Sequence, residues 1–192
     1  MEIRKITKEE VNALPLIKFE GECVVIDKPE DVAAAIDELR NCRLIGFDTE
    51  TKPAFKKGQV YPVALLQLAT KQKVFLFRLL ETGLTDEMID LFANPRVKIA
   101  GIGIRDDIKD LQKLRGFDPV NFVDLNVKAR ELGFQSIGAR NFAGMFLGGR
   151  ISKSQQVSNW ENETLTEAQI SYAATDAWLC IAVYEGMLAL EV

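Results

Sequence analysis

Arg43-Leu44-Ile45-Gly46-Phe47-Asp48-Thr49-Glu50 is the stretch that decides the fold, because a short apolar run here ends in two acids. The run predicts a central β-strand. Side chains two residues apart on a strand share a face, so the carboxylates of Asp48 and Glu50 should point the same way. Two like charges so placed repel each other unless a cation lies between them. An isolated pair of this kind is still more often an exposed strand end with solvated acids.

The rest of the chain alternates strands and helices around this strand. Further short apolar runs predict strands at 23–26, 63–69, 73–77, 97–102 and 121–123. Helical spacing of apolar residues predicts helices at 7–14, 29–40, 85–93, 105–115, 125–132, 137–147 and 166–190, whereas 148–165 has no period and is expected to be a loop. This order predicts an α/β fold with a mixed sheet, in which strand 43–48 pairs antiparallel with the strands of 63–77.

Length and composition are those of an ordinary globular protein. The 192 residues suit one domain, 1–192, with a polar lead-in over 1–20. No apolar run reaches the roughly 18 residues of a membrane span, and the charged start lacks a signal-peptide core. We therefore expect a cytoplasmic protein with no membrane partner. The net charge of −4 argues weakly against a partner coated with phosphates.

Missing residue types exclude several kinds of chemistry. The chain has no histidine, which excludes Ser-His-Asp triads, HExxH zinc sites and histidine bases. Its three cysteines, Cys23, Cys42 and Cys180, are far apart and form no CxxC pair. They are expected to be small buried side chains rather than a disulfide framework. The oxygen ligands that remain favour hard cations such as Mg²⁺ or Mn²⁺.

A third acid lies on the apolar face of the predicted helix 105–115. Ile104, Ile108, Leu111 and Leu114 mark the inward stripe of that helix, and Asp107 falls within it. A carboxylate on a buried stripe is costly unless it is paired or bound to a metal. The neighbouring acid at 106 lies off the stripe. The alternative for Asp107 is an acid favoured at a helix N-terminus by the helix dipole.

The final predicted helix carries a fourth acid. It begins with a capping box formed by Thr166 and Gln169. Tyr172 and Asp176 are four residues apart and therefore lie on one face of the helix. Small residues surround them, which could let the helix backbone approach the sheet closely. An alanine-rich packed helix with a Tyr–Asp hydrogen bond explains the pattern equally well.

Four carboxylates from three distant segments have the type and number for a site that holds two divalent cations. Two such ions can activate water and stabilise the leaving oxygen of a phosphodiester. The stretches Phe47-Asp48-Thr49-Glu50, Gly103-Ile104-Arg105-Asp106-Asp107 and Tyr172-Ala173-Ala174-Thr175-Asp176 resemble the three motifs of the DEDDy-type 3′→5′ exonucleases. That family includes ribonuclease D and the exonuclease domain of the Werner-syndrome helicase. The resemblance covers about residues 22–190. Besides the three motifs, it includes the segments Tyr61–Leu68 and Ser158-Asn159-Trp160.

The resemblance implies a ribonuclease H-like fold, with a five-stranded mixed sheet flanked by helices. It implies two Mg²⁺ or Mn²⁺ ions, with Asp48 between them, Glu50 and Asp176 on the first and Asp107 on the second. Tyr172 would orient the attacking water or help to deprotonate it. The expected substrates are the 3′ ends of DNA or RNA, from which the family releases nucleoside 5′-monophosphates. Because Asp106 and Asp107 are adjacent, the second motif could be displaced by one residue; the apolar stripe favours Asp107.

Three further residues are candidates for binding the substrate. Lys52 follows the first motif in a lysine-bearing loop that could meet phosphates, although a solvated turn explains that loop equally well. The family resemblance places Lys153 near the phosphate chain. Trp160 is a candidate for contact with a base, but a tryptophan is more often a core anchor.

Two other functions stay open at this point. A nuclease fold can act as a non-catalytic module that binds nucleic acid or a protein, although all four carboxylates and the tyrosine are present here. A carboxylate-metal phosphatase acting on small phosphate esters would use similar ligands. The sequence does not separate DNA from RNA, because no group that reads the 2′-hydroxyl is identifiable.

Overall fold

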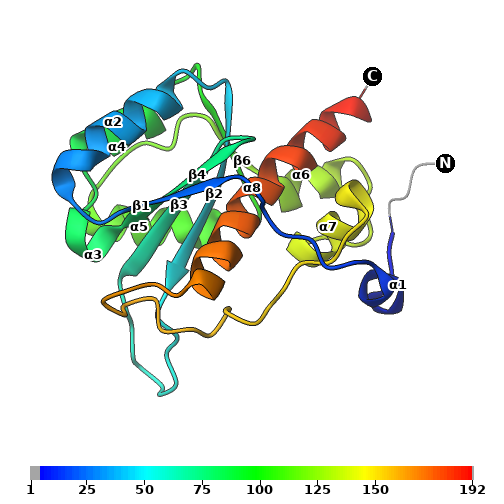
Figure 1. Ribbon diagram of the computed structural model, residues 1–192. Coiled ribbons are helices and arrows are strands. Elements are labelled where there is room, and N and C mark those ends of the chain that lie inside the picture. Colours follow the sequence, from blue (N-terminus) through cyan, green and yellow to red (C-terminus); the bar gives the residue numbers. More distant parts are fainter. Residues whose placement is uncertain (1–4, 192) are drawn as a thin grey trace.

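Strand β2 (Leu44–Thr51), which contains the deciding stretch, lies inside the sheet of the computed structural model, which describes residues 5–191. The described residues form a six-stranded sheet in the order β1-β4-β3-β2-β5-β6 (Figure 1). The other strands are β1 (Glu22–Ile26), β3 (Val63–Ala69), β4 (Lys73–Arg78), β5 (Lys98–Gly101) and β6 (Phe122–Asp124). Strand β3 runs antiparallel to β2 and β4, and the other neighbours are parallel. The predicted α/β fold, mixed sheet and antiparallel pairing are confirmed.

The sheet has one strand more than the five that the resemblance implies. Both short outer strands pair through their backbones, β1 with β4 over five residues and β6 with β5 over three. Each apolar run that predicts a strand in the sequence therefore forms one. Residues 1–4 of the expected lead-in, and residue 192, lie outside the described residues.

The helices also follow the sequence pattern closely. They are α1 (Lys8–Ala13), α2 (Pro29–Arg40), α3 (Leu79–Thr82), α4 (Asp86–Phe92), α5 (Arg105–Leu114), α6 (Leu125–Glu131), α7 (Ala139–Leu147) and α8 (Glu167–Ala189). The single turn α3 is too short to show a period and was not predicted. The predicted capping box of α8 is confirmed: the Thr166 hydroxyl accepts from Gln169 N at 3.2 Å, and the Gln169 side chain accepts from Thr166 N at 3.0 Å. None of the described helices has the length and apolar character to cross a membrane.

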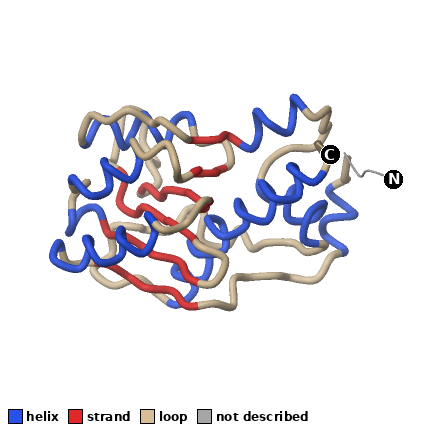
Figure 2. The backbone as a smooth tube through the Cα atoms, turned by 90° about the horizontal axis from the view of Figure 1, so that it is seen from above, coloured by secondary structure: helices blue, strands red, loops and turns tan. Residues whose placement is uncertain are grey.

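Helices cover both faces of the strand layer, which Figure 2 shows from above. Helices α2, α4 and α5 enclose one apolar core against the sheet, and α8 encloses a second on the opposite face. Alternation along β2 sends Ile45 and Phe47 into the first core, so Gly46 and Asp48 face α8. A third core joins α6, α7 and the second half of α8.

The approach of α8 to β2 depends on small residues, as the sequence suggests. A Cβ on Gly46 would lie 1.9 Å from the carbonyl oxygen of Ala177, so only glycine fits at this position. Cys180 is buried one turn further along α8, with its sulfur 3.7 Å from the Phe47 oxygen and 3.2 Å from the Asp176 oxygen. The close contact brings the segment of α8 that carries Asp176 directly over the carboxyl end of β2.

Candidate metal centre

Three of the predicted acids meet at the carboxyl end of β2. Asp48, Glu50 and Asp176 each offer a carboxylate oxygen, and these oxygens all lie within 4.8 Å of one another. The side chains are part-buried. Strand periodicity places the first two on the α8 face, and the contact between Gly46 and Ala177 delivers the third. This is a set of oxygen ligands from two elements that are far apart in the sequence.

The electrostatics of this cluster disfavour three ionised acids without a cation. Burial, and then the charges of the neighbouring acids, raise the pKa of Glu50 to about 10. Burial raises the pKa of Asp176 to about 7, against the opposing effect of the Tyr172 hydroxyl. The pKa of Asp48 is also well above its usual range because of burial and the charges of Asp176 and Asp107. The metal-free protein therefore retains protons on this cluster near neutral pH.

Asp107 approaches the cluster from the opposite face of the sheet. The Thr49 hydroxyl donates a hydrogen bond to Asp107 Oδ1, and Thr49 lies between the two acids of β2. The charge of Asp107 contributes to the raised pKa of both Asp48 and Glu50, although it is not one of the three acids within 4.8 Å. The side chain of the adjacent Asp106 is 88% exposed and pairs with Lys109, so Asp107 is the acid of this pair that lies near the cluster.

The turn that positions Asp107 depends on a glycine. Gly103 has φ +72°, a conformation that glycine adopts without strain, and its N–H donates to Asp124 Oδ1 at 3.0 Å. Helix α5 begins directly after this turn. Of the predicted inward stripe, Ile104 and Leu111 are buried, but Leu114 is 41% exposed because the helix ends there and leaves the sheet.

Tyr172 lies one helical turn before Asp176, and both residues line a cleft that opens beside the cluster. Its hydroxyl is close enough to Asp176 to lower the pKa of that carboxyl. Burial and the nearby acids raise the pKa of Tyr172 above its usual range. The hydroxyl therefore keeps its proton at neutral pH and is available as a hydrogen-bond donor.

The three residues predicted to bind the substrate lie in different surroundings in the structure. Lys52 Nζ forms an ion pair with Glu161 at 3.1 Å and lies 4.9 Å from the centre of the Tyr61 ring. Lys153 lines the cleft beside Tyr172. Trp160 is only 1% exposed and packs against the Tyr172 ring at 6.0 Å. The prediction that Trp160 contacts a base is wrong for this structure, because its ring is enclosed in the core and supports Tyr172 from behind.

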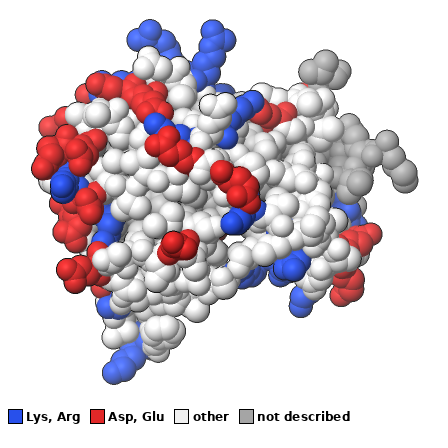
Figure 3. Space-filling model, in the orientation of Figure 1, with Lys and Arg blue, Asp and Glu red and all other residues white. Residues whose placement is uncertain are grey.

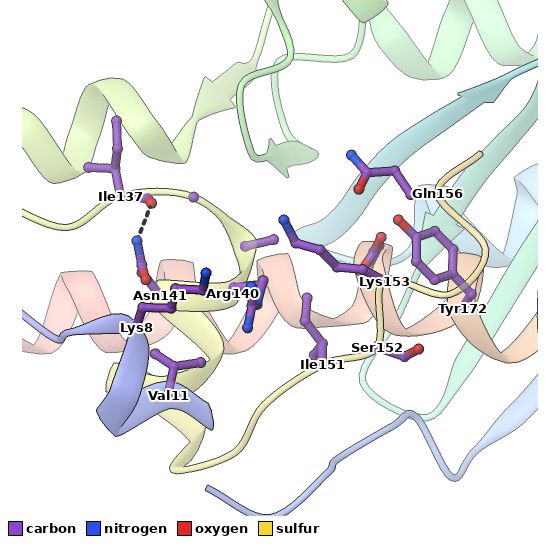
Figure 4. Close-up of a pocket in the computed structure, with 13 residues that line it drawn as sticks. Lys8, Val11, Ile137, Arg140, Asn141, Ile151, Ser152, Lys153, Gln156 and Tyr172 are labelled. Atoms are coloured by element: carbon purple, nitrogen blue, oxygen red, sulfur yellow. Dashed lines mark hydrogen bonds between the residues drawn. The ribbon is translucent and has the colours of Figure 1, made fainter. Parts of the chain in front are cut away.

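A cleft of about 410 Å³ leads away from the cluster toward α1 and α7 (Figure 4). Tyr172 borders it at one end and Lys8 of α1 at the other, with Lys153 and Arg140 between them. Asp176, one helical turn after Tyr172, also lines it. Sequence reasoning missed Lys8 and Arg140, because neither lies near a motif. It also missed Gln67, whose signal is a polar side chain within the apolar run of β3, a strand that is buried throughout.

The donor set fits a hard divalent cation. Mg²⁺ and Mn²⁺ prefer carboxylate oxygens, and the cluster offers three of them on a part-buried surface. A cation would also remove the mutual repulsion that raises the pKa of Asp48 and Glu50. Within the described residues, this is the only group of three or more acids or cysteines whose ligand atoms come so close together.

A mixed sheet with carboxylates at the end of its central strand, closed by a helix that adds another, is the architecture of the ribonuclease H-like α/β proteins. A sequence profile described as 3′-5′ exonuclease matches residues 23–190, and the chain belongs to this family.

Relatives and solved structures agree with this membership. The chain is 31% identical over 186 residues to the mouse bifunctional 3′-5′ exonuclease/ATP-dependent helicase WRN, a match that covers 91% of this chain and 13% of that protein. It is 32% identical over 172 residues to ribonuclease D of Acidiphilium cryptum, covering 88% of this chain and 43% of that one. Both relatives are thus more than twice as long as the matched part.

Two solved structures share the fold. The EXO domain of Nibbler from Aedes aegypti superposes with a TM-score of 0.81 at 23% identity, covering 91% of this chain and 94% of that one. Ribonuclease D of Escherichia coli gives a TM-score of 0.77 at 21% identity, covering 86% and 44% of the two chains.

Proposed function

We propose that this protein is a 3′→5′ exonuclease that uses two Mg²⁺ or Mn²⁺ ions to hydrolyse phosphodiester bonds at the 3′ ends of nucleic acids. The products would be nucleoside 5′-monophosphates. The observation that carries the proposal is the convergence of Asp48, Glu50 and Asp176 within 4.8 Å. Membership of the 3′-5′ exonuclease family supports the direction of the reaction.

The proposed roles follow from where each side chain lies. Asp48, Glu50 and Asp176 would hold the first cation, and Asp48 together with Asp107 would hold the second. When bound, such ions lower the pKa of water and stabilise charge on phosphoryl oxygens. Tyr172 would donate a hydrogen bond that fixes the attacking water, because its raised pKa keeps its proton in place. Thr49 would orient Asp107 through the hydrogen bond between their side chains.

Digestion of a 5′-labelled oligomer tests the proposal. Wild-type protein with MnCl₂ should shorten the oligomer stepwise from its 3′ end and release nucleoside 5′-monophosphates. Asp48→Ala should abolish this activity and keep the circular-dichroism spectrum of the wild type. An active Asp48→Ala variant would refute the assignment. Parallel DNA and RNA oligomers of the same sequence would identify the preferred sugar.

A pair of variants tests the assignment of the second motif. Asp107→Asn removes the carboxylate that Thr49 holds, whereas Asp106→Asn makes the same change one residue away on an exposed side chain. The proposal requires a large loss of activity in the first and near wild-type activity in the second. The opposite order would mean that the motif is displaced by one residue.

The same assay separates the two rival functions. A non-catalytic binding module would bind the oligomer and leave it intact in MnCl₂. A phosphatase would release inorganic phosphate from small esters and would not shorten a long oligomer. Retention of all four carboxylates and of Tyr172 favours the nuclease over the binding module.

A further inference from the structure

The cleft beside the metal centre is formed partly by α1, a helix that no motif includes. Helix α1 lies beside α7 in Figure 1 and Figure 4. Its position is fixed by bonds to both neighbouring segments: Arg140 Nη2 donates to Asn12 Oδ1 at 2.7 Å, and Arg150 Nε donates to the Leu14 oxygen at 3.1 Å. Leu16 also forms a parallel bridge with Arg150. Helix α1, which forms one side of the cleft, is therefore held in place by hydrogen bonds to the rest of the fold.

The charged side chains that line this cleft are mostly positive. Apart from Asp176 at its inner end, its charged lining residues are the cations Lys8, Arg140 and Lys153. Within residues 5–191, no ion pair joins any of the three to a carboxylate. Nε of Arg140 is buried without a hydrogen-bond partner in the described residues. The chain as a whole is acidic, with a net charge of −4, and acidic side chains crowd the end formed by α2 and α3 (Figure 3).

We infer that the cleft holds the sugar-phosphate backbone of the strand whose 3′ end lies at the carboxylates, with Lys8 and Arg140 as phosphate contacts beyond Lys153. The inference rests on the proposed function, since it assumes that the strand ends at the acidic cluster. Three cations spread along an elongated cleft suit a chain of phosphates better than one small anion, which would need them to converge. Because the cations carry no base-reading geometry, this grip is independent of sequence.

Variants that replace a cation by glutamine measure how much Lys8 and Arg140 contribute to binding of the strand. Lys8→Gln removes one exposed charge, and Arg140→Gln removes a second that also bonds to Asn12. Lys28→Gln, on an exposed residue before α2 whose side chain caps nothing, is the matched control. Anisotropy of a 5′-labelled single-stranded oligomer in EDTA reports binding without cleavage.

Each phosphate contact on a single strand adds roughly 0.7 to the slope of log affinity against log salt. Each variant should therefore bind about 5-fold more weakly near 0.1 M salt, with a slope smaller by about 0.7. The control should match the wild type. Unchanged affinity and slope in both variants would overturn the inference. If the wild type cleaves the oligomer and both variants bind it normally, only the role of the cleft in holding the strand is refuted. If the wild type binds the oligomer and never cleaves it, only the proposed nuclease activity is refuted.

A separate observation concerns the floor of the metal centre. Gln67 on β3 is 0% exposed, and both polar atoms of its amide lack a hydrogen-bond partner in the described residues. It pairs directly with Asp48 across the sheet, which places its side chain on the same face and makes Glu50 its diagonal neighbour. The amide lies near enough to Glu50 to lower the pKa of that carboxyl slightly. A buried amide without a partner is costly, so a polar residue at this position needs a reason.

We propose that Gln67 is a positioning residue whose Nε2 donates a hydrogen bond to the Glu50 carboxylate and holds it for the cation. Neither polar atom of the amide has a hydrogen-bond partner among the described residues, so we expect the amide to cost stability until this bond forms. A cation would hold the Glu50 carboxylate in one orientation, in which an oxygen of this diagonal neighbour can serve as the acceptor that the Gln67 amide lacks. Hydrogen bonds to ligating carboxylates commonly contribute 10–100-fold to metal affinity or activity.

Replacing Gln67 by methionine, which has a similar shape and no amide, gives two opposite effects. Removing an unsatisfied buried group should raise the metal-free melting temperature by roughly 2–6 °C. The affinity for Mn²⁺, measured by calorimetric titration with MnCl₂, should fall about 10–100-fold. Gln72→Met makes the same change on the exposed turn between β3 and β4 and should alter neither value.

A merely structural role of Gln67 would lower the metal-free melting temperature, and that result would overturn the proposal. Unchanged Mn²⁺ affinity in Gln67→Met would overturn it as well. A wild-type protein that binds no Mn²⁺ would instead refute the metal centre itself, so the two failures are distinguishable.

Discussion

Asp176→Asn should stabilise the metal-free protein at neutral pH, although it destroys a ligand. Burial raises the pKa of Asp176 from its ordinary 3.8 to about 7 in the folded protein. Between these two values the folded state keeps a proton that the unfolded state has lost. The free energy of unfolding therefore falls as pH rises through this window, and the stability that the proton provides is lost by about pH 7.

The size of the effect follows from the shift. At about 1.4 kcal/mol per pH unit, a window of roughly three units corresponds to about 4 kcal/mol. Asparagine cannot ionise, so this part of the pH dependence should disappear in the variant. The charge of Asp176 also raises the pKa of Asp48 and Glu50, so its removal relieves repulsion on both. The variant should be more stable than the wild type at pH 7.5 in EDTA by a few kcal/mol, about 4 at most.

Urea denaturation at several pH values between about 4 and 8, followed by circular dichroism, measures this difference. Adding MnCl₂ should narrow the difference in stability, because the wild type gains about 2.7 kcal/mol at a hundredfold excess over its dissociation constant and the variant gains much less. Asp90→Asn, on the exposed face of α4, is the control for the chemical change. An Asp176→Asn protein that has the pH dependence of the wild type, or that is less stable in EDTA, would refute the reasoning.

Three further changes test the surroundings of the site. Gly46→Ala should destabilise the fold by roughly 1–3 kcal/mol and weaken Mn²⁺ binding, because its Cβ would lie 1.9 Å from the Ala177 oxygen and push α8 away. Gly116→Ala is the control, because a Cβ at that position meets nothing. Equal losses of stability in thermal melts of the two variants would contradict the packing argument. Tyr172→Phe should keep the melting temperature and Mn²⁺ affinity near wild type but slow 3′-end digestion, and loss of folding would indicate a structural role. Thr166→Ala removes the side-chain cap of α8 and should lower the free energy of unfolding, measured by urea denaturation, by about 1 kcal/mol. The Mn²⁺ affinity of the folded variant should equal that of the wild type.

Local patterns in the sequence were sufficient for the strands and for every helix except the single turn α3. Alternation along β2 correctly placed Asp48 and Glu50 on one face, because the direction of a side chain on a strand depends only on its position. The helical stripe favoured Asp107 over Asp106 for the same reason, and the structure agrees. The same stripe failed at Leu114, where the helix ends and its last turn leaves the core.

What only the tertiary structure decided is how elements remote in the chain lie against one another. Asp176 reaches the carboxyl end of β2 because Gly46 and Ala177 allow α8 to approach, and no local pattern encodes that distance. The burial of Trp160 likewise depends on how the loop before α8 folds back over the sheet. Periodicity determines which face a side chain occupies, but packing across the sheet determines which faces meet.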